Sequence, residues 1–260
     1  MKIVSVLRSS DEYGERQARF LHDQLAGYDA VCMSDIPLPG IPTIPLRYDW
    51  PGWWAKMELF DPRGDLAREP VLYMDLDTLI VGDLTPLMDA VSGLSQLVML
   101  SDPQHPQYPA SGVMYIPPRV RARTWNLWLR GPTAHMAVAQ RPGRRGDQGF
   151  IGRVNPAALR WDKVAPGAIV NYKTEVADYG KPGYSHRYSR GYGYVPESAA
   201  IVCFHANPRP WDLSELPCKP SSSATIRVST GSDNCKTPSP EPQRSSTAPT
   251  KAHTPATARR

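Results

Sequence analysis

The chain has 260 residues, of which 41% are hydrophobic, and a formal net charge of +5. This length supports one α/β domain with a sizeable core, or at most two small domains. The longest apolar runs fall far short of the ~20 residues that a membrane-spanning helix needs. The apolar run at the N-terminus is also too short for the core of a signal peptide, so we expect a cytoplasmic protein. The four cysteines form no CxxC pair, and we expect reduced thiols.

The positive charge is concentrated at the C-terminal end. Residues 214–260 carry seven Lys or Arg and three Asp or Glu, whereas residues 1–213 carry 23 and 22. Ser, Thr and Pro dominate the C-terminal stretch, and such a composition cannot bury enough apolar surface to offset the entropy of ordering. We therefore predict one domain over 1–213 and a disordered basic tail over 214–260. Because the domain is nearly neutral, we expect no nucleic-acid partner.

The pattern of apolar residues predicts alternating strands and helices. In chain order, it predicts a strand at Lys2–Leu7, a helix at Tyr13–Leu25, a strand at Ala30–Ser34, a helix at Trp53–Phe60, strands at Pro70–Met74, Gln96–Leu100 and Gly112–Ile116, a helix at Arg119–Leu129 and a strand at Ala199–Phe204. A Pro-rich connection precedes the second helix. Strands that alternate with helices indicate a mostly parallel sheet with helices on both faces.

Two aspartates, Asp75 and Asp77, follow the predicted strand Pro70–Met74. Ligands of open α/β sheets bind outside the carboxyl ends of the strands. Mg²⁺ and Mn²⁺ prefer oxygen ligands and accept phosphate oxygens in their remaining positions. An Asp-x-Asp pair also occurs as two ordinary acidic loop residues. Directly after a buried strand, however, it favours a metal site.

Two later segments carry further polar residues. His205 follows the predicted strand Ala199–Phe204, and Arg209 lies four residues on. A histidine there can complete a metal shell while the arginine neutralises phosphate, although a single histidine after a strand is more often structural. Asp147 and Gln148 stand between two glycines. They fit either a polar pair that binds sugar hydroxyls or a helix start with Asp147 as N-cap.

Several of these segments together resemble one family. The stretch AKMELFDPRGDLAREPVLYMDLDTLIVGDLTPL (Ala55–Pro86) resembles the core of family 8 glycosyltransferases, the glycogenin and bacterial galactosyltransferase group. Four more segments resemble motifs of this family in the same chain order: VLRSSDEY (Val6–Tyr13), SGVMYI (Ser111–Ile116), GDQGFI (Gly146–Ile151) and HANPRPW (His205–Trp211). The stretch WPGWWAKMELF is also similar to a bacterial and phage group of such enzymes. Five segments in order make chance a poor explanation.

The resemblance implies a GT-A fold, which is a Rossmann-like sheet that binds a nucleotide sugar with a divalent cation. It implies a UDP-sugar donor, Mn²⁺ or Mg²⁺ on the diphosphate, an acceptor that the sequence does not identify, and transfer with retention at the anomeric carbon. Carried over by position, the metal ligands are Asp75, Asp77 and His205; the donor is held by Leu7, Tyr13, Lys56 and Arg209; and the residues nearest the reacting carbon are Asp147 and Gln148.

Three positions depart from the family pattern. Ala110 stands where the family has an asparagine before Ser-Gly, which removes a polar contact to the sugar. Ala206 replaces the glycine after the metal histidine, and we expect this to be tolerated only with a negative φ. Arg209 replaces a lysine, which keeps the charge but changes its geometry. These departures place the donor sugar in more doubt than the reaction class.

Two other function classes share part of this pattern. A haloacid-dehalogenase-like phosphohydrolase also carries Asp-x-Asp-Thr after an apolar strand, but near the chain start and with a later acidic pair. A non-catalytic carbohydrate-binding protein does not need the metal and phosphate residues. The segment Tyr179–Tyr194, rich in Tyr, Gly and basic residues, fits a surface loop, a lid over the acceptor or a platform for single-stranded nucleic acid.

Overall fold

The computed structural model describes residues 1–138, 146–177 and 193–220. All of these lie within one compact unit, Met1–Ser222. Most of the predicted tail and nearly all of the Tyr179–Tyr194 segment lie outside the described residues. The described start of the tail contacts the body, because Val195 N donates to Cys218 O and Lys219 Nζ donates to Glu197 O. The boundary between 213 and 214 and the disordered tail remain predictions.

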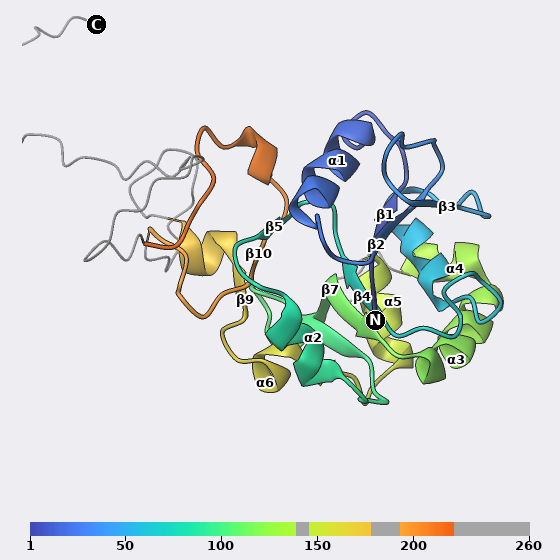
Figure 1. Ribbon diagram of the computed structural model, residues 1–260. Coiled ribbons are helices and arrows are strands. Elements are labelled where there is room, and N and C mark those ends of the chain that lie inside the picture. Colours follow the sequence, from blue (N-terminus) through green and yellow to red (C-terminus); the bar gives the residue numbers. More distant parts are fainter. Residues whose placement is uncertain (139–145, 178–192, 221–260) are drawn as a thin grey trace, which may run out of the picture. The chain divides into compact units, whose positions relative to one another are not determined.

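The main sheet has seven strands in the order β3-β2-β1-β4-β7-β6-β8 (Figure 1). The strands are β1 (Lys2–Leu7), β2 (Ala30–Ser34), β3 (Thr43–Pro45), β4 (Val71–Met74), β6 (Val98–Ser101), β7 (Pro109–Ile116) and β8 (Leu159–Arg160). All neighbouring pairs are parallel except the two that involve β7, which is antiparallel to β4 and β6. The mostly parallel α/β sheet is confirmed.

A second sheet of three strands was not predicted. Its order is β5-β10-β9, formed by β5 (Thr78–Ile80), β10 (Ile201–Cys203) and β9 (Ile169–Asn171). The strand predicted at Ala199–Phe204 is therefore not part of the main sheet. It pairs antiparallel with β5, with Cys203 opposite Thr78. This register brings the residues after β10 beside the turn that follows β4.

Helices cover both faces of the main sheet, as expected. Because side chains of a strand alternate between faces, Ile3 packs in one core cluster and Val4 in the other. The first cluster is covered by α1 (Glu15–Gln24), α2 (Thr85–Val91) and α6 (Trp161–Val164). The second is covered by η1 (Gly52–Phe60), α3 (Pro118–Leu129) and α5 (Gly146–Val154). Shorter elements are α4 (Pro132–Val138), η2 (Tyr172–Val176) and η3 (Pro210–Asp212).

Local bounds differ from the predictions for physical reasons. The helix predicted from Tyr13 begins at Glu15, because Gly14 is its N-cap and Gln17 Oε1 accepts from Gly14 N. The helix predicted at Trp53–Phe60 is a 3₁₀ helix, η1. Seven of its nine residues are buried, so packing on both sides leaves no polar face of the kind an amphipathic α-helix has.

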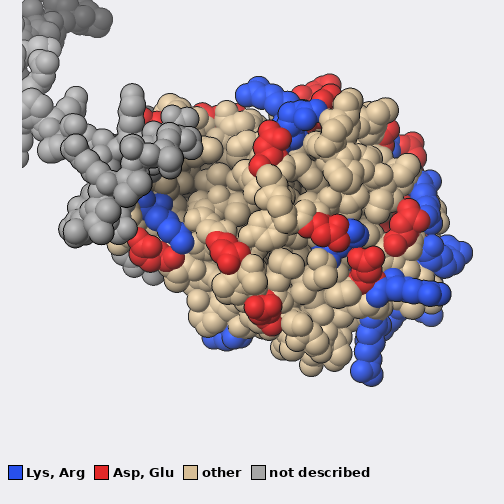
Figure 2. Space-filling view, viewed as in Figure 1, with Lys and Arg blue, Asp and Glu red and all other residues tan. Residues whose placement is uncertain are grey.

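Expectations about thiols and membranes have different outcomes. Cys32 and Cys203 are free and buried, whereas Cys218 is disulfide-bonded. The expectation of reduced thiols does not hold for Cys218. Within the described ranges, no helix has the length and apolar character needed to cross a bilayer. Basic and acidic side chains are interspersed on the face shown in Figure 2.

Arg121 is a buried cation that ties α3 to the end of η1. The residue is 1% exposed, and its guanidinium donates to Leu59 O at 2.5 Å and to Glu69 O at 2.8 Å. Burial lowers the pKa of Arg121 to about 10. The arginine thus satisfies one carbonyl group at the end of η1 and one in the segment that connects η1 to β4, and it helps to position that segment.

We expect Arg121→Met to lower the free energy of unfolding by roughly 3 kcal/mol, because two carbonyl oxygens lose a charged donor. Arg123 lies on the same helix but is exposed. Arg123→Met is therefore the matched control and should change stability by less than about 0.5 kcal/mol. Urea denaturation measures both variants, and equal stability would contradict a clamping role for Arg121.

Candidate active site

A cavity of about 470 Å³ opens where several elements end or begin. It lies at the carboxyl ends of β1 and β4, at the starts of η1 and α5, along the first half of β7 and beside the segment after β10. Eight of the residues predicted for the site line it: Tyr13, Lys56, Asp75, Asp77, Asp147, Gln148, His205 and Arg209. The fold thus brings together segments that are up to two hundred residues apart in the sequence.

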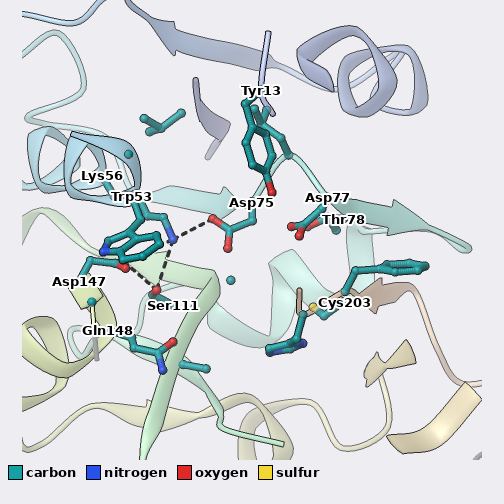
Figure 3. Close-up of a pocket in the computed structure, with 18 of the residues that line it drawn as sticks. Tyr13, Trp53, Lys56, Asp75, Asp77, Thr78, Ser111, Asp147, Gln148 and Cys203 are labelled. Atoms are coloured by element: carbon teal, nitrogen blue, oxygen red, sulfur yellow. Dashed lines mark hydrogen bonds and ion pairs between the residues drawn. The ribbon is translucent and has the colours of Figure 1, made fainter. Parts of the chain in front are cut away.

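Lys56 lies between two carboxylates in this cavity (Figure 3). Its Nζ is 2.9 Å from Asp75 Oδ1 and 3.3 Å from Asp147 Oδ2, and the residue is 7% exposed. Ser111 Oγ donates to Asp147 Oδ2 at 2.7 Å. Burial alone lowers the pKa of Lys56, but Asp147 and Asp75 outweigh it and raise this pKa above its usual value. The lysine therefore stays charged and balances both acids.

Asp75 and Asp77 lie in the turn between β4 and β5. Asp75 N donates to Gly112 O at 2.8 Å, which fixes the backbone of the turn against β7. The Tyr73 hydroxyl donates to the Asp75 carboxylate, and Asp77 forms an ion pair with Arg209. Burial, together with the charge of Asp75, raises the pKa of Asp77 to about 7. Arg209 thus compensates Asp77, whereas Asp75 shares Lys56 with Asp147.

Arg209 connects Asp77 to the far end of the cavity. Its guanidinium also pairs with Glu12 Oε1 at 2.8 Å and lies 5.4 Å from the centroid of the Tyr13 ring. The Tyr13 ring in turn meets Trp211 edge to face at 5.9 Å. Arg209 is therefore held by an acid on either side and by an aromatic ring. This leaves a cation fixed at the junction of the acidic turn and the Tyr13 end.

His205 is held by Asn171, at the end of β9. The Asn171 side-chain oxygen accepts from Lys173 N and Thr174 N, so its amide nitrogen faces His205 Nδ1. Burial lowers the pKa of His205, which favours the neutral ring. With Nδ1 accepting, the proton of the neutral ring lies on Nε2. Metal ligation through Nε2 therefore requires this proton to move to Nδ1 and the Asn171 amide to rotate.

The described part of the chain holds no group of three or more His, Cys, Asp or Glu already arranged to bind a metal ion. Asp75 and Asp77 do fit a divalent cation in chemistry, because they are neighbouring acids whose charges repel, with Asp77 buried and Asp75 partly exposed to the cavity. In the present arrangement Lys56 and Arg209 offset that repulsion. A metal ion would have to share these carboxylates with the two side-chain cations or displace those cations.

Comparison with solved structures gives the fold a name. An active-site mutant of LgtC aligns with a TM-score of 0.50 and 14% identity, over 81% of this chain and 89% of that one. The glycosyltransferase GlyE of Streptococcus pneumoniae TIGR4 aligns with a TM-score of 0.56 and 18% identity, over 81% of this chain and 56% of that one. The fold is of the GT-A type. The bifunctional glycosyltransferase WbbM aligns with a TM-score of 0.52 and 14% identity, over 81% and 46%.

No protein-family model and no curated protein matches the sequence. At identities of 14–18%, the structural likeness establishes the GT-A fold and leaves the chemistry to be argued from the residues of the cavity. In this GT-A domain those residues come from both sheets. The main sheet positions the Tyr13 and Asp75 segments, whereas the small sheet positions His205 and Arg209.

Leu7 differs from the other residues predicted for the donor. Its side chain is 0% exposed and packs in the core cluster that α1 covers. Its neighbours Val6 and Arg8 line the cavity instead, because side chains of β1 alternate between faces. A contact between the Leu7 side chain and a ligand in the cavity is therefore ruled out, and only its backbone remains available.

Other lining residues were missed by sequence reasoning. Ser111, Glu12 and Cys203 lie within quoted motifs or predicted strands, yet nothing in the local pattern assigned them to the cavity. Trp53 also lines it. Ser111 can be found when its motif is compared with structures of the same fold. The position of Trp53 follows only from the packing of η1.

Ala206 has a φ of 51°, in the left-handed region. The expectation that alanine is tolerated there only with a negative φ is wrong. The reason is that the neighbouring contacts determine the backbone: His205 is held by Asn171 and Arg209 by Asp77 and Glu12. The chain between these anchors has to turn sharply, and alanine accepts the strain.

We expect Ala206→Gly to raise the free energy of unfolding by about 0.5–1 kcal/mol. Relief of left-handed strain gains ~1–2 kcal/mol, and the added freedom of glycine in the unfolded chain offsets part of it. Ala122, exposed on α3, is the matched control, and Ala122→Gly should lower stability by about 1 kcal/mol. Urea denaturation gives both values. Destabilisation by both substitutions would contradict the strain at Ala206.

We also expect Lys56→Met to lower the free energy of unfolding by about 3 kcal/mol in metal-free buffer, because Asp75 and Asp147 lose their shared cation. Lys163 is exposed on α6, so Lys163→Met is the control and should have little effect. Chemical denaturation with EDTA present measures both. An unchanged midpoint for Lys56→Met would show that the two acids do not need this cation.

Proposed function

We propose that the protein is a metal-dependent glycosyltransferase that moves a sugar from a nucleoside-diphosphate donor to an acceptor. The observation that carries this proposal is the pairing of two acids of one turn, the partly exposed Asp75 and the buried Asp77, with two fixed cations in one cavity of a GT-A fold. A diphosphate with a divalent cation satisfies such a set, because it brings negative charge to the cations and positive charge to the acids. The proposed donor is a UDP-sugar.

The nucleotide end of the site is proposed to lie at Tyr13. Arg209 is held between the Tyr13 ring and Asp77, so a diphosphate bound at Arg209 leaves the nucleoside on the Tyr13 side. The arginine would then exchange Asp77 for phosphate oxygens, which it can bind with two N–H groups at once. Asp77 is thereby released toward the cation. In the proposed complex, the ion pair between Arg209 and Asp77 is thus replaced by two others, one between Arg209 and phosphate and one between Asp77 and the metal ion.

The proposed metal ligands are Asp75 and Asp77, with His205 as the third once Asn171 has turned its amide. When bound, Mn²⁺ or Mg²⁺ offsets the negative charge that develops on the nucleoside diphosphate as the glycosidic bond breaks. Asp75 is 32% exposed and keeps one oxygen on Lys56. A carboxylate can accept at both oxygens, so Asp75 can hold Lys56 and still present its second oxygen.

The donor sugar is proposed to lie over Lys56, Ser111 and the start of α5. Asp147 has one oxygen fixed by Ser111 and Lys56, which orients the carboxylate toward the cavity. Gln148 lines the cavity beside it. These two residues are the proposed catalytic pair, and the resemblance to family 8 supports transfer with retention. Ala110 lines the same wall and offers no polar side-chain contact to the sugar.

We expect UDP with MnCl₂ to raise the melting temperature by roughly 5–10 °C at a ligand concentration 100 times its Kd. EDTA should abolish this shift. UDP-glucose or UDP-galactose should be hydrolysed slowly with Mn²⁺ present, and Asp75→Asn should lower that rate at least ~100-fold, because charge stabilisation of the leaving group is lost. Differential scanning fluorimetry and detection of released UDP measure these effects.

Asp89→Asn is the matched control, since Asp89 is an exposed acid on α2, and it should leave both measurements unchanged. p-Nitrophenyl phosphate serves as the competing substrate. Its hydrolysis by the unmodified protein, lost in Asp75→Asn and without any binding of UDP, would replace the transferase proposal with a phosphohydrolase that uses Asp75 as nucleophile.

A further inference from the structure

Trp53 is the most exposed large hydrophobic side chain in the described part of the chain. It is 58% exposed, whereas Trp54, the next residue, is 6% exposed. Single exposed hydrophobic side chains are common on protein surfaces and need no explanation. Trp53, however, lines the cavity that holds Lys56 and Asp147. Its exposed ring therefore belongs to the proposed active site.

The position of the Trp53 ring is set by its neighbours. Trp54 stacks on Trp128 of α3, with ring centroids 5.1 Å apart and planes 14° apart. This contact anchors the start of η1 in the core. Gly52, just before, has a φ of 53°, which turns the chain so that Trp53 faces the cavity while Trp54 faces the core. Trp54 is thus a buried anchor, and Trp53 presents an exposed ring.

The indole of Trp53 lies against Gly146 at the start of α5. A Cβ atom added to Gly146 would come within 3.0 Å of Trp53 Nε1, and Gly146 has a φ of 60°. Both facts favour glycine at this position. The next residue is Asp147, so the supported ring lies directly beside the proposed catalytic pair. Figure 3 shows Trp53 next to Lys56 and Asp147, across Asp75 from Asp77 and Cys203.

We propose that Trp53 is the stacking platform for the acceptor, and that this acceptor is a pyranose sugar. This inference rests on the proposed function. A pyranose has an apolar face of C–H groups that packs on an aromatic ring. The ring of Trp53, 58% exposed, offers such a surface beside the proposed position of the donor sugar over Lys56, Ser111 and Asp147. The nucleoside base is assigned elsewhere, because the proposed position of the diphosphate at Arg209 leaves the base on the side of Tyr13, which contacts Arg209.

The test uses saturation-transfer-difference NMR on the full chain with UDP and MgCl₂, and the probes are methyl β-D-galactopyranoside and methyl β-D-glucopyranoside. We expect saturation of ring C–H protons on one face of at least one probe. Trp53→Ala should weaken this signal about fivefold to tenfold, and Trp53→Phe should restore most of it, because an aromatic face is retained. The Kd of UDP, measured by calorimetry, should change less than about twofold in Trp53→Ala.

Tyr108→Ala is the control, since Tyr108 is exposed at 41% and does not line the cavity. Binding of UDP without any saccharide signal, or an equal signal in Trp53→Ala, would overturn the acceptor platform. A tenfold weaker Kd for UDP in Trp53→Ala would also overturn it and assign the ring to the nucleotide. Absence of UDP binding in the unmodified protein, with a saccharide signal that depends on Trp53, would instead refute the proposed donor.

Discussion

A buried lysine between two carboxylates is the interaction on which the cavity depends. Lys56 comes from η1, Asp75 from the turn after β4 and Asp147 from α5, so this one cation joins three separate elements. Without it, two acids would face each other in a site largely removed from water, which is costly for charged groups. Ser111 on β7 completes the arrangement through its bond to Asp147.

A second constraint is the antiparallel pairing of β10 with β5. It places Cys203 opposite Thr78 and so brings the residues after β10 to the turn that contains Asp77. Arg209 then reaches Asp77 and Glu12, and Asn171 on the neighbouring strand holds His205. The small sheet therefore holds the residues after β10 beside the turn that contains Asp77. The strained backbone at Ala206 is a consequence of these fixed ends.

The two cations, Lys56 and Arg209, lie in different surroundings within the cavity. Arg209 lies toward Tyr13, whereas Lys56 lies toward Asp147 and the exposed ring of Trp53. For the proposed donor, this difference favours the orientation with the nucleoside toward Tyr13 and the sugar toward Asp147. This asymmetry is the physical basis for separating the proposed donor site from the proposed acceptor site.

Much of this protein can be predicted from the sequence because burial on a regular element leaves a local pattern. Continuous apolar runs marked β1, β2 and β4, and the motifs that follow strands marked the acids, the histidine and the arginine that line the cavity. The sequence by itself thus determined the α/β class and most of the polar residues of the site.

Only the tertiary structure determines the orientation and the contacts of these residues. The inward side chain of Leu7, the amide of Asn171 facing His205, the positive φ of Ala206 and the exposed ring of Trp53 all depend on contacts between residues far apart in the chain. Such contacts leave no periodic signal in the sequence, because each is set by the packing of several elements at once.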